Sequence, residues 1–190
     1  STQEQIEEIV SIAEKDASGW RKTTLAARSK VLNAVADRIA ENRGDLIACM
    51  SAITGKSFME GDVEVSEGID FCRFYPVSMQ TFEDIKDVSY QPKGIVMVIP
   101  PWNFPFAIPV GGVAAALTGG NTVILKPATV AFPIAWEFAK CFWDAGVPKD
   151  ALQVICPGDR SSLNYLSAHP SVKHIILTGG TDTAFRLLEN

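Results

Sequence analysis

The chain has 190 residues, of which 47% are hydrophobic and 21% are charged, and its formal net charge at pH 7 is −5. These values are typical of one globular domain with a sizeable core, and an acidic chain without a basic block excludes nucleic acid as a partner. No apolar run approaches the roughly 20 residues that cross a bilayer, and the acidic N-terminus has no apolar signal core. The cysteines lack CxxC spacing, which predicts reduced, buried thiols in a cytosol-like compartment. They are Cys49, Cys72, Cys141 and Cys156.

The first 80 residues show the periodicity of amphipathic helices, with apolar side chains three and four positions apart. Thr24 is a suitable N-cap for the second helix, and Gly55 is a suitable stop for the third. Pro76 is expected to end the fourth helix, because proline cannot donate the next backbone hydrogen bond. The predicted helices cover residues 4–20, 25 to about 42, 45–53 and 62–75.

From residue 95 onward, short apolar runs alternate with helical segments, which predicts parallel strands joined by helical crossovers. Residues 81–93 are expected to form an edge strand or a hairpin that leads into this sheet. The predicted strands cover 95–99, 122–126, 152–156 and 174–178, and the predicted helices cover about 107–118, 131–145, 161–168 and from 181 to the end of the chain. We therefore expect an α/β fold: N-terminal helices (1–80) and a Rossmann-like open parallel sheet with helices on both faces (81–190), together forming a single domain.

Residues 94–129 organise this fold, because they contain a strand, a turn, an Ala-rich helix and a second strand in direct succession. Asn103 lies in the turn after the first of these strands, and Lys126 follows the second. Ligands of open parallel sheets bind outside the carboxyl ends of the strands. Both side chains are therefore expected to face a ligand.

Two motifs in this stretch resemble the NAD(P)-dependent aldehyde dehydrogenase superfamily: Pro-Trp-Asn-Phe-Pro at 101–105 and Leu-Lys-Pro-Ala at 125–128. The doubled proline at 100–101 and the run EVSEGIDFCRFY at 64–75 are similar to the pyrroline-5-carboxylate (glutamate semialdehyde) dehydrogenase branch. The resemblance covers essentially the whole chain. It implies that the 190 residues are one truncated NAD-binding domain, that the catalytic domain lies elsewhere, and that the full-length protein oxidises glutamate semialdehyde to glutamate.

The resemblance also implies roles for individual residues. The Asn103 amide would donate a hydrogen bond to the oxyanion that forms when a thiolate attacks the aldehyde, and Trp102 and Phe106 would line the aldehyde channel. Without the resemblance, Asn103 would be a turn-forming residue and the two aromatic residues would belong to the core. NAD is the implied cofactor, with NADP as a possibility, and the implied cofactor-binding residues are Ile99, Pro100, Pro101, Trp102, Lys126, Thr129, Gly158, Gly179 and Gly180.

The chain departs from the family pattern at several of the implied dinucleotide contacts. Thr129 stands where the family usually has a carboxylate, Gly180 replaces a hydroxyl residue, and Ala184 replaces a glycine. Asp182 adds negative charge close to the expected pyrophosphate, and Arg160 replaces a glycine of the turn under the adenine. No G-x-G-x-x-G motif is present. These departures leave open the dinucleotide affinity and the choice between NAD and NADP.

The sequence lacks the nucleophile of the family, because no cysteine follows a Gly-Gln-x pattern. The family cysteine and general-base glutamate are expected beyond residue 190, so the 190-residue chain alone should be inactive. Cys156 is the only thiol at a strand end, and no base is close to it in sequence. His169 and His174 are interpreted as structural, and no spacing suits a metal site.

The interpretation therefore keeps three functions open: a hydrolytic aldehyde dehydrogenase, a coenzyme-A-dependent acylating one, and a non-catalytic nucleotide-binding or assembly module. The resemblance implies a small aldehyde substrate, a homo-oligomer when the protein is full-length, and possible fusion to proline dehydrogenase. It also implies a location in the cytoplasm, or in the mitochondrial matrix of a eukaryote.

Overall fold

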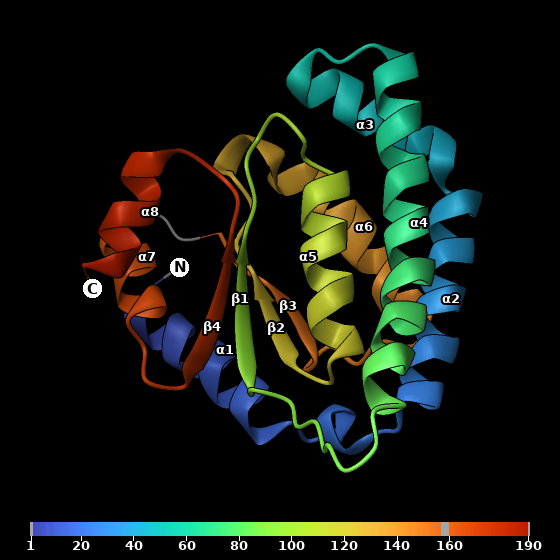
Figure 1. Ribbon diagram of the computed structural model, residues 1–190. Coiled ribbons are helices and arrows are strands. Elements are labelled where there is room, and N and C mark those ends of the chain that lie inside the picture. Colours follow the sequence, from blue (N-terminus) through green and yellow to red (C-terminus); the bar gives the residue numbers. More distant parts are fainter. Residues whose placement is uncertain (1, 157–159, 190) are drawn as a thin grey trace.

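The computed structural model describes residues 2–156 and 160–189, and its first half is helical, as the apolar periodicity predicts. The elements of this half are α1 (Gln3–Lys15), the 3-10 turn η1 (Trp20–Lys22), α2 (Leu25–Glu41), α3 (Arg43–Thr54) and α4 (Phe58–Glu83). Helices α2 and α4 pack along each other at one side of the molecule (Figure 1).

The second half alternates strands and helices. Its elements are β1 (Ile95–Ile99), α5 (Ala107–Thr118), β2 (Thr122–Leu125), the 3-10 turn η2 (Thr129–Ala131), α6 (Phe132–Asp144), β3 (Leu152–Val154), α7 (Arg160–Ser167), β4 (Val172–Leu177) and α8 (Thr181–Leu188). The strands form one parallel sheet in the order β3-β2-β1-β4. Val98 of β1 pairs with Leu125 of β2, and Ile99 pairs with Leu177 of β4. The carboxyl ends of the three strands therefore meet at one edge, as expected for a Rossmann-like sheet.

Helices cover both faces of the sheet, with α5 and α6 on one face and α1 and α7 on the other (Figure 1). The side chains of β1 alternate between two cores, as the pleat of a strand requires. Val96 and Val98 join the larger core with α2, α4, α5 and α6, whereas Ile95, Met97 and Ile99 join the smaller core with α1 and α7. The predicted fold class and the helices on both faces are confirmed.

Two glycines allow α4, α5 and β1 to approach closely. A Cβ atom on Gly68 of α4 would lie 2.6 Å from Cε1 of Phe106, which is shorter than any ordinary carbon contact. A Cβ atom on Gly112 of α5 would lie 2.9 Å from Cγ1 of Val98. The lack of a side chain at Gly68 therefore lets α4 lie close to the start of α5, and the lack of one at Gly112 lets α5 lie close to β1.

Helix α1 is shorter than predicted, because it ends at Lys15 and Asp16 adopts the left-handed conformation, with φ 46°. Trp20 is the last residue of the predicted helix 4–20, and in the structure it lies in the separate turn η1. Its side chain is buried, and its Nε1 donates a hydrogen bond to the Leu117 carbonyl at 3.3 Å. Apolar periodicity therefore identified the correct buried residue and extended the helix too far.

Helix α4 is longer than predicted at both ends. It begins with a capping box in which the Ser57 hydroxyl accepts a hydrogen bond from the Glu60 N–H and the Glu60 carboxylate accepts one from the Ser57 N–H. It then continues through Pro76, so the prediction that this proline limits the helix was wrong. The Pro76 ring is among the buried side chains of α4, and burial of this apolar ring offsets the missing backbone hydrogen bond.

Residues 84–94 form no strand, so the predicted edge strand or hairpin is also wrong. Helix α4 occupies the start of that segment, and the Phe82 and Tyr90 rings meet edge to face with their centroids 6.1 Å apart, an arrangement that aromatic pairs favour. Helix α8 was expected to run to the end of the chain, and it stops at Leu188. Among the described residues, no helix has the length and apolar character needed to cross a membrane.

Candidate functional site

The turn between β1 and α5 carries Asn103. Strand β1 ends at Ile99, and two prolines then prevent further ladder hydrogen bonds, so the chain leaves the sheet at its carboxyl edge. Trp102, Asn103 and Phe104 are exposed, whereas Phe106 at the start of α5 is fully buried. Within residues 2–156 and 160–189, the Asn103 side chain makes no hydrogen bond. Its amide is therefore available to a ligand.

The neighbouring strands end beside this turn. The Lys126 N–H donates to the Val98 carbonyl at 2.9 Å, and the Thr178 N–H donates to the Ile99 carbonyl at 3.1 Å. These two bonds continue the ladder to the last residues of the sheet. They place Lys126 on one side of β1 and the Thr178–Gly180 turn on the other.

A cleft of about 570 Å³ lies between these strand ends. β2 and β3 lie on one side of β1 and β4 lies on the other, so the cleft occupies the point where the strand order reverses, which is where open α/β sheets bind ligands. The structure brings together most of the predicted site residues. The lining includes Ile99, Pro100, Pro101, Trp102, Asn103, Lys126, Gly179 and Gly180.

The cleft fits the phosphates of a dinucleotide on the side of α8. A Cβ atom on Gly180 would meet nothing within 4 Å, and one on Gly179 would meet only Leu177 at 3.7 Å, so the backbone is bare toward the cleft. Gly180 is the N-cap of α8, and no side chain caps the helix there. The free N–H groups of a helix N-terminus attract phosphate. Asp182 in the first turn opposes this attraction with its negative charge.

Lys126 supplies a cation on the other side of the cleft. Burial lowers the pKa of its ammonium group, and the neighbouring Cys156 partly opposes this change. A partly desolvated lysine forms stronger hydrogen bonds than one in bulk water, because the surrounding dielectric constant is lower. Its position suits ribose hydroxyls, for which it would be a donor.

Other predicted site residues lie outside the cleft lining. Thr129 is exposed in η2, and only its neighbour Ala128 reaches the cleft. Gly158 falls outside the described residues. Phe106 is fully buried, with its ring 5.7 Å from the ring of Phe138, so the structure gives it a place in the core, and its role in an aldehyde channel stays a prediction.

Sequence reasoning missed six lining residues: Phe104, Ile108, Ala128, Leu177, Thr178 and Thr183. Phe104 is 44% exposed and belongs to the same Pro-Trp-Asn-Phe-Pro motif as Asn103, so the motif itself could have identified it. Thr183 lies in the first turn of α8, and the glycines before it were the available signal. Ile108 resembles an ordinary core residue in sequence.

The described cysteines form no disulfide, and two of them are too strongly buried to act as nucleophiles. Burial raises the pKa of Cys72 to about 12 and that of Cys141 to about 11. Thiols with such values remain protonated at neutral pH, and only a thiolate attacks a carbonyl. The part of the chain that the structure describes holds no cluster of three potential metal ligands.

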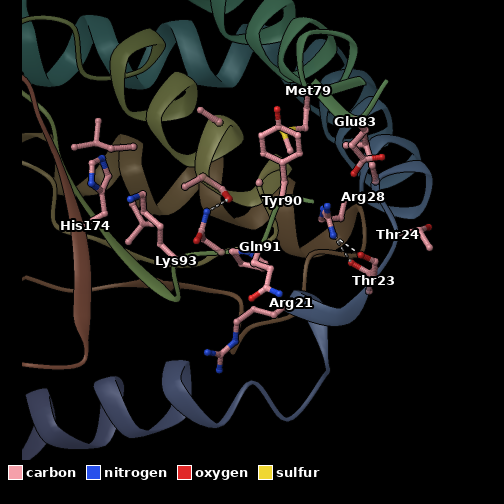
Figure 2. A pocket seen from close by; sticks show the side chains of 18 residues that line it. Arg21, Thr23, Thr24, Arg28, Met79, Glu83, Tyr90, Gln91, Lys93 and His174 are labelled. Carbon is pink, nitrogen blue, oxygen red and sulfur yellow. Dashed lines mark hydrogen bonds between the residues drawn. The ribbon is translucent and has the colours of Figure 1, made fainter. Parts of the chain in front are cut away.

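A second hollow, of about 560 Å³, lies at the opposite edge of the sheet, where α2 begins and α4 ends (Figure 2). Two of its cations, Arg28 and Arg21, are held by the protein itself. Arg28 donates to the carbonyls of Thr23 and Thr118, and Arg21 pairs with Asp16. This hollow therefore has a structural explanation, and it contains none of the predicted site residues.

The fold is that of an open α/β domain with a cleft where its strand order reverses, and comparison with known proteins identifies its family. The sequence pattern of the aldehyde dehydrogenase family matches residues 1–190. The chain belongs to this family.

The individual relatives of the chain carry more specific names than the family does. A 1-pyrroline-5-carboxylate dehydrogenase of Geobacillus sp. (strain WCH70) is 34% identical over 200 aligned positions, which include all of this chain and 39% of the relative. The crystal structure of proline utilization A from Bdellovibrio bacteriovorus superposes with a TM-score of 0.93 at 30% identity, over 100% of this chain and 21% of that one. A Thermus thermophilus 1-pyrroline-5-carboxylate dehydrogenase superposes equally well, at 0.93 and 27% identity, over 39% of its length. The chain thus spans about two fifths of the dehydrogenases it matches.

Proposed function

We propose that the full-length protein is an NAD(P)-dependent aldehyde dehydrogenase that oxidises glutamate semialdehyde to glutamate. The observation that carries this proposal is the position of Asn103. Its amide makes no hydrogen bond within the described residues, and it lines a cleft together with Lys126 and the bare Gly179–Gly180 backbone. The substrate follows from the relatives, which are named for pyrroline-5-carboxylate.

Asn103 would act when charge develops on the aldehyde oxygen. Attack by a thiolate forms a sulfur–carbon bond and moves the carbonyl π electrons onto oxygen, and the Asn103 amide N–H donates to that oxygen. A preorganised donor of this kind lowers the barrier by roughly 3–4 kcal/mol. The thiolate and the base that activates water come from parts of the protein outside this chain, so the 190-residue chain alone is expected to be inactive.

The dinucleotide fits the residues that line the cleft. NAD(P), when bound, supplies the hydride acceptor of the reaction. Lys126 would donate to ribose hydroxyls, and the Gly179–Gly180 turn and the α8 N-terminus would hold the pyrophosphate. Thr129 and Gly158 belong to the proposed adenosine side. Trp102 and Phe104 are the exposed aromatic residues beside Asn103, where the aldehyde would enter.

The remaining features of the proposal concern the whole protein. The 190 residues form one incomplete NAD-binding domain, the protein is a homo-oligomer, and it acts in the cytoplasm or the mitochondrial matrix. The described cysteines form no disulfide, which agrees with a reducing compartment. Fusion to proline dehydrogenase is supported by the bifunctional proline utilization A structures among the neighbours.

The test is a spectrophotometric assay of the full-length protein at 340 nm. Glutamate semialdehyde is compared with acetaldehyde, NAD with NADP, and each with and without coenzyme A. We expect reduced dinucleotide to form fastest with glutamate semialdehyde and without any need for coenzyme A. A strict requirement for coenzyme A would identify an acylating enzyme instead, and the absence of turnover with every aldehyde would refute the proposal.

A non-catalytic nucleotide-binding or assembly module is the second candidate, and two observations favour it. Thr129 does not line the cleft, and Asp182 places negative charge in the first turn of α8, where the pyrophosphate would bind. Isothermal titration of the full-length protein with NAD distinguishes the two: a module that binds NAD without turnover supports this candidate.

A further inference from the structure

A buried carboxylate lies beneath the turn that carries Asn103. Glu64 of α4 has a side chain only 2% exposed, and its Oε2 accepts hydrogen bonds from the N–H groups of Phe106 and Ala107, each at 3.1 Å. The first residues of α5 have no cap of their own, because Phe106 occupies the N-cap position and cannot accept these bonds. Glu64 therefore caps α5 from a different helix, and its negative charge also complements the dipole of α5.

Lys56 completes the arrangement. It lies between Gly55, which ends α3, and Ser57, which caps α4, and its Nζ pairs with the other carboxylate oxygen of Glu64. The same ammonium group lies 4.1 Å from the centroid of the Phe104 ring, a cation–π distance. One ammonium group therefore joins the buried carboxylate to the residue next to Asn103.

These contacts fix both ends of a short segment. Ile99 is held by the sheet, Phe106 and Ala107 are held by Glu64, and the Phe104 ring is held by Lys56. Asn103 lies between the fixed points and makes no hydrogen bond of its own within the described residues. The position of the Asn103 backbone, and with it the region that its amide can reach, is therefore set by the contacts of its neighbours.

We propose that Lys56 and Glu64 are positioning residues that aim the Asn103 amide into the cleft, an inference that rests on the proposed oxyanion role of Asn103. A charged pair is a poor means of stabilisation in a buried place, because both groups lose their hydration. Burial indeed lowers the pKa of Lys56, with Glu60 and Glu67 opposing the change. A charged pair that adds little to the stability of the fold but fixes the positions of its neighbours is suited to orienting the turn that carries Asn103.

The first experiment separates positioning from folding. In the full-length protein, Lys56→Met keeps the aliphatic stem and removes the charge, and we expect kcat to fall on the order of 10-fold, with the affinity for NAD within twofold of wild type. Lys56→Arg should restore most of the loss, because it keeps a cation over the Phe104 ring. Lys140→Met is the matched control: Lys140 pairs with Glu137 on the exposed surface of α6, and its loss should leave kcat unchanged.

The decisive comparison repeats Lys56→Met in an Asn103→Ala background. If Lys56 acts through Asn103, its effect on kcat disappears once the amide is absent. An equal loss of kcat in both backgrounds would overturn the proposal, since Lys56 would then act by another route. An unchanged kcat in Lys56→Met alone would overturn it as well.

Hydrogen exchange gives a readout that does not depend on activity. In Glu64→Gln the amides of Phe106 and Ala107 lose a charged acceptor, and we expect both to exchange at least 10-fold faster, whereas amides in the middle of α6 are unchanged. Exchange at the wild-type rate would show that Glu64 does not hold the turn. If instead Asn103→Ala alone has wild-type turnover, the proposed function fails, and a fast-exchanging Glu64→Gln variant would still establish how the turn is held.

Discussion

The two hollows at opposite edges of the sheet are almost equal in volume, about 570 Å³ at the carboxyl edge and about 560 Å³ at the amino edge. They differ in the state of their polar groups. In the amino-edge hollow, Arg28 donates to the Thr23 carbonyl (Figure 2). Arg28 also donates to the Thr118 carbonyl, and Arg21 pairs with Asp16. In the carboxyl-edge cleft, Asn103 has no hydrogen bond within the described residues, and the Gly179–Gly180 backbone is bare.

The comparison shows that volume alone does not identify a binding site. Polar groups that already have protein partners stabilise the fold, and a ligand would have to compete for them. Polar groups without partners are tolerated only where water or a ligand completes them. Substitutions at the two edges should therefore affect different quantities, and the following predictions begin with the largest effect.

Asn103→Ala in the full-length protein should lower kcat by roughly 10²- to 10³-fold, because it removes a donor to the developing oxyanion. Steady-state assays of reduced dinucleotide formation measure this loss. The dissociation constant for NAD should stay within twofold of wild type. A variant with normal kcat would place Asn103 among the ordinary turn residues and remove the main difference between the two edges.

Arg28→Met at the amino edge should lower the free energy of unfolding by about 2 kcal/mol, because the buried carbonyl of Thr118 and the partly buried carbonyl of Thr23 lose their donor. Urea denaturation of the full-length protein measures this change. The methionine stem fills a similar volume, so the lost hydrogen bonds dominate. A fall in NAD affinity without loss of stability would show that this hollow binds the ligand, contrary to our assignment.

Lys126→Met should weaken NAD binding by about 10-fold with less effect on kcat, because it removes a donor to the ribose and keeps the aliphatic stem. Burial sets the Lys126 pKa below its ordinary value, so the wild-type affinity should fall as the pH rises toward that pKa and the ammonium loses its proton. In Lys126→Met this part of the pH dependence should be absent. Calorimetry over a pH series tests both statements, and a variant with the wild-type affinity and pH profile would contradict them.

Asp182→Asn should tighten NAD binding by about twofold to threefold at low salt, because it removes a negative charge from the first turn of α8. The gain should vanish at high salt, where the charge is screened. Asp45→Asn, in the first turn of α3, is a matched control outside the cleft and should not alter NAD affinity. Weaker binding by Asp182→Asn would mean that this side chain contacts the dinucleotide favourably.

The sequence predicted the sheet half of the fold better than the helical half, for a physical reason. Buried parallel strands are short continuous apolar runs, and all four runs became strands within two residues of the predicted bounds. Helix ends depend on individual caps: the box formed by Ser57 and Glu60 could have been read from the sequence, whereas the left-handed Asp16 could not. Pro76 shows the limit of local rules, because its tolerance depends on the burial of its ring.

In the candidate site too, local sequence predicted some features and tertiary packing determined the others. The motifs identified Asn103 and Lys126, and strand register brought them together, because both follow the ends of neighbouring strands. Sequence alone did not reveal the contacts of Glu64, since this residue and Phe106 are separated by 42 positions in the sequence and no local pattern indicates that the two meet. The burial of Phe106 likewise depends on α4, which local sequence does not specify.

A single methyl group added at Gly68 would affect a part of the molecule outside α4. In most helices a change from glycine to alanine is among the safest substitutions, since it reduces the freedom of the unfolded chain. Here the new methyl group would displace the Phe106 ring, whose backbone N–H is bound to Glu64 at the base of the Asn103 turn. A natural variant at this position would therefore be scored as benign by helix propensity and by side-chain size, and would nevertheless disturb the base of the Asn103 turn from a residue of another helix.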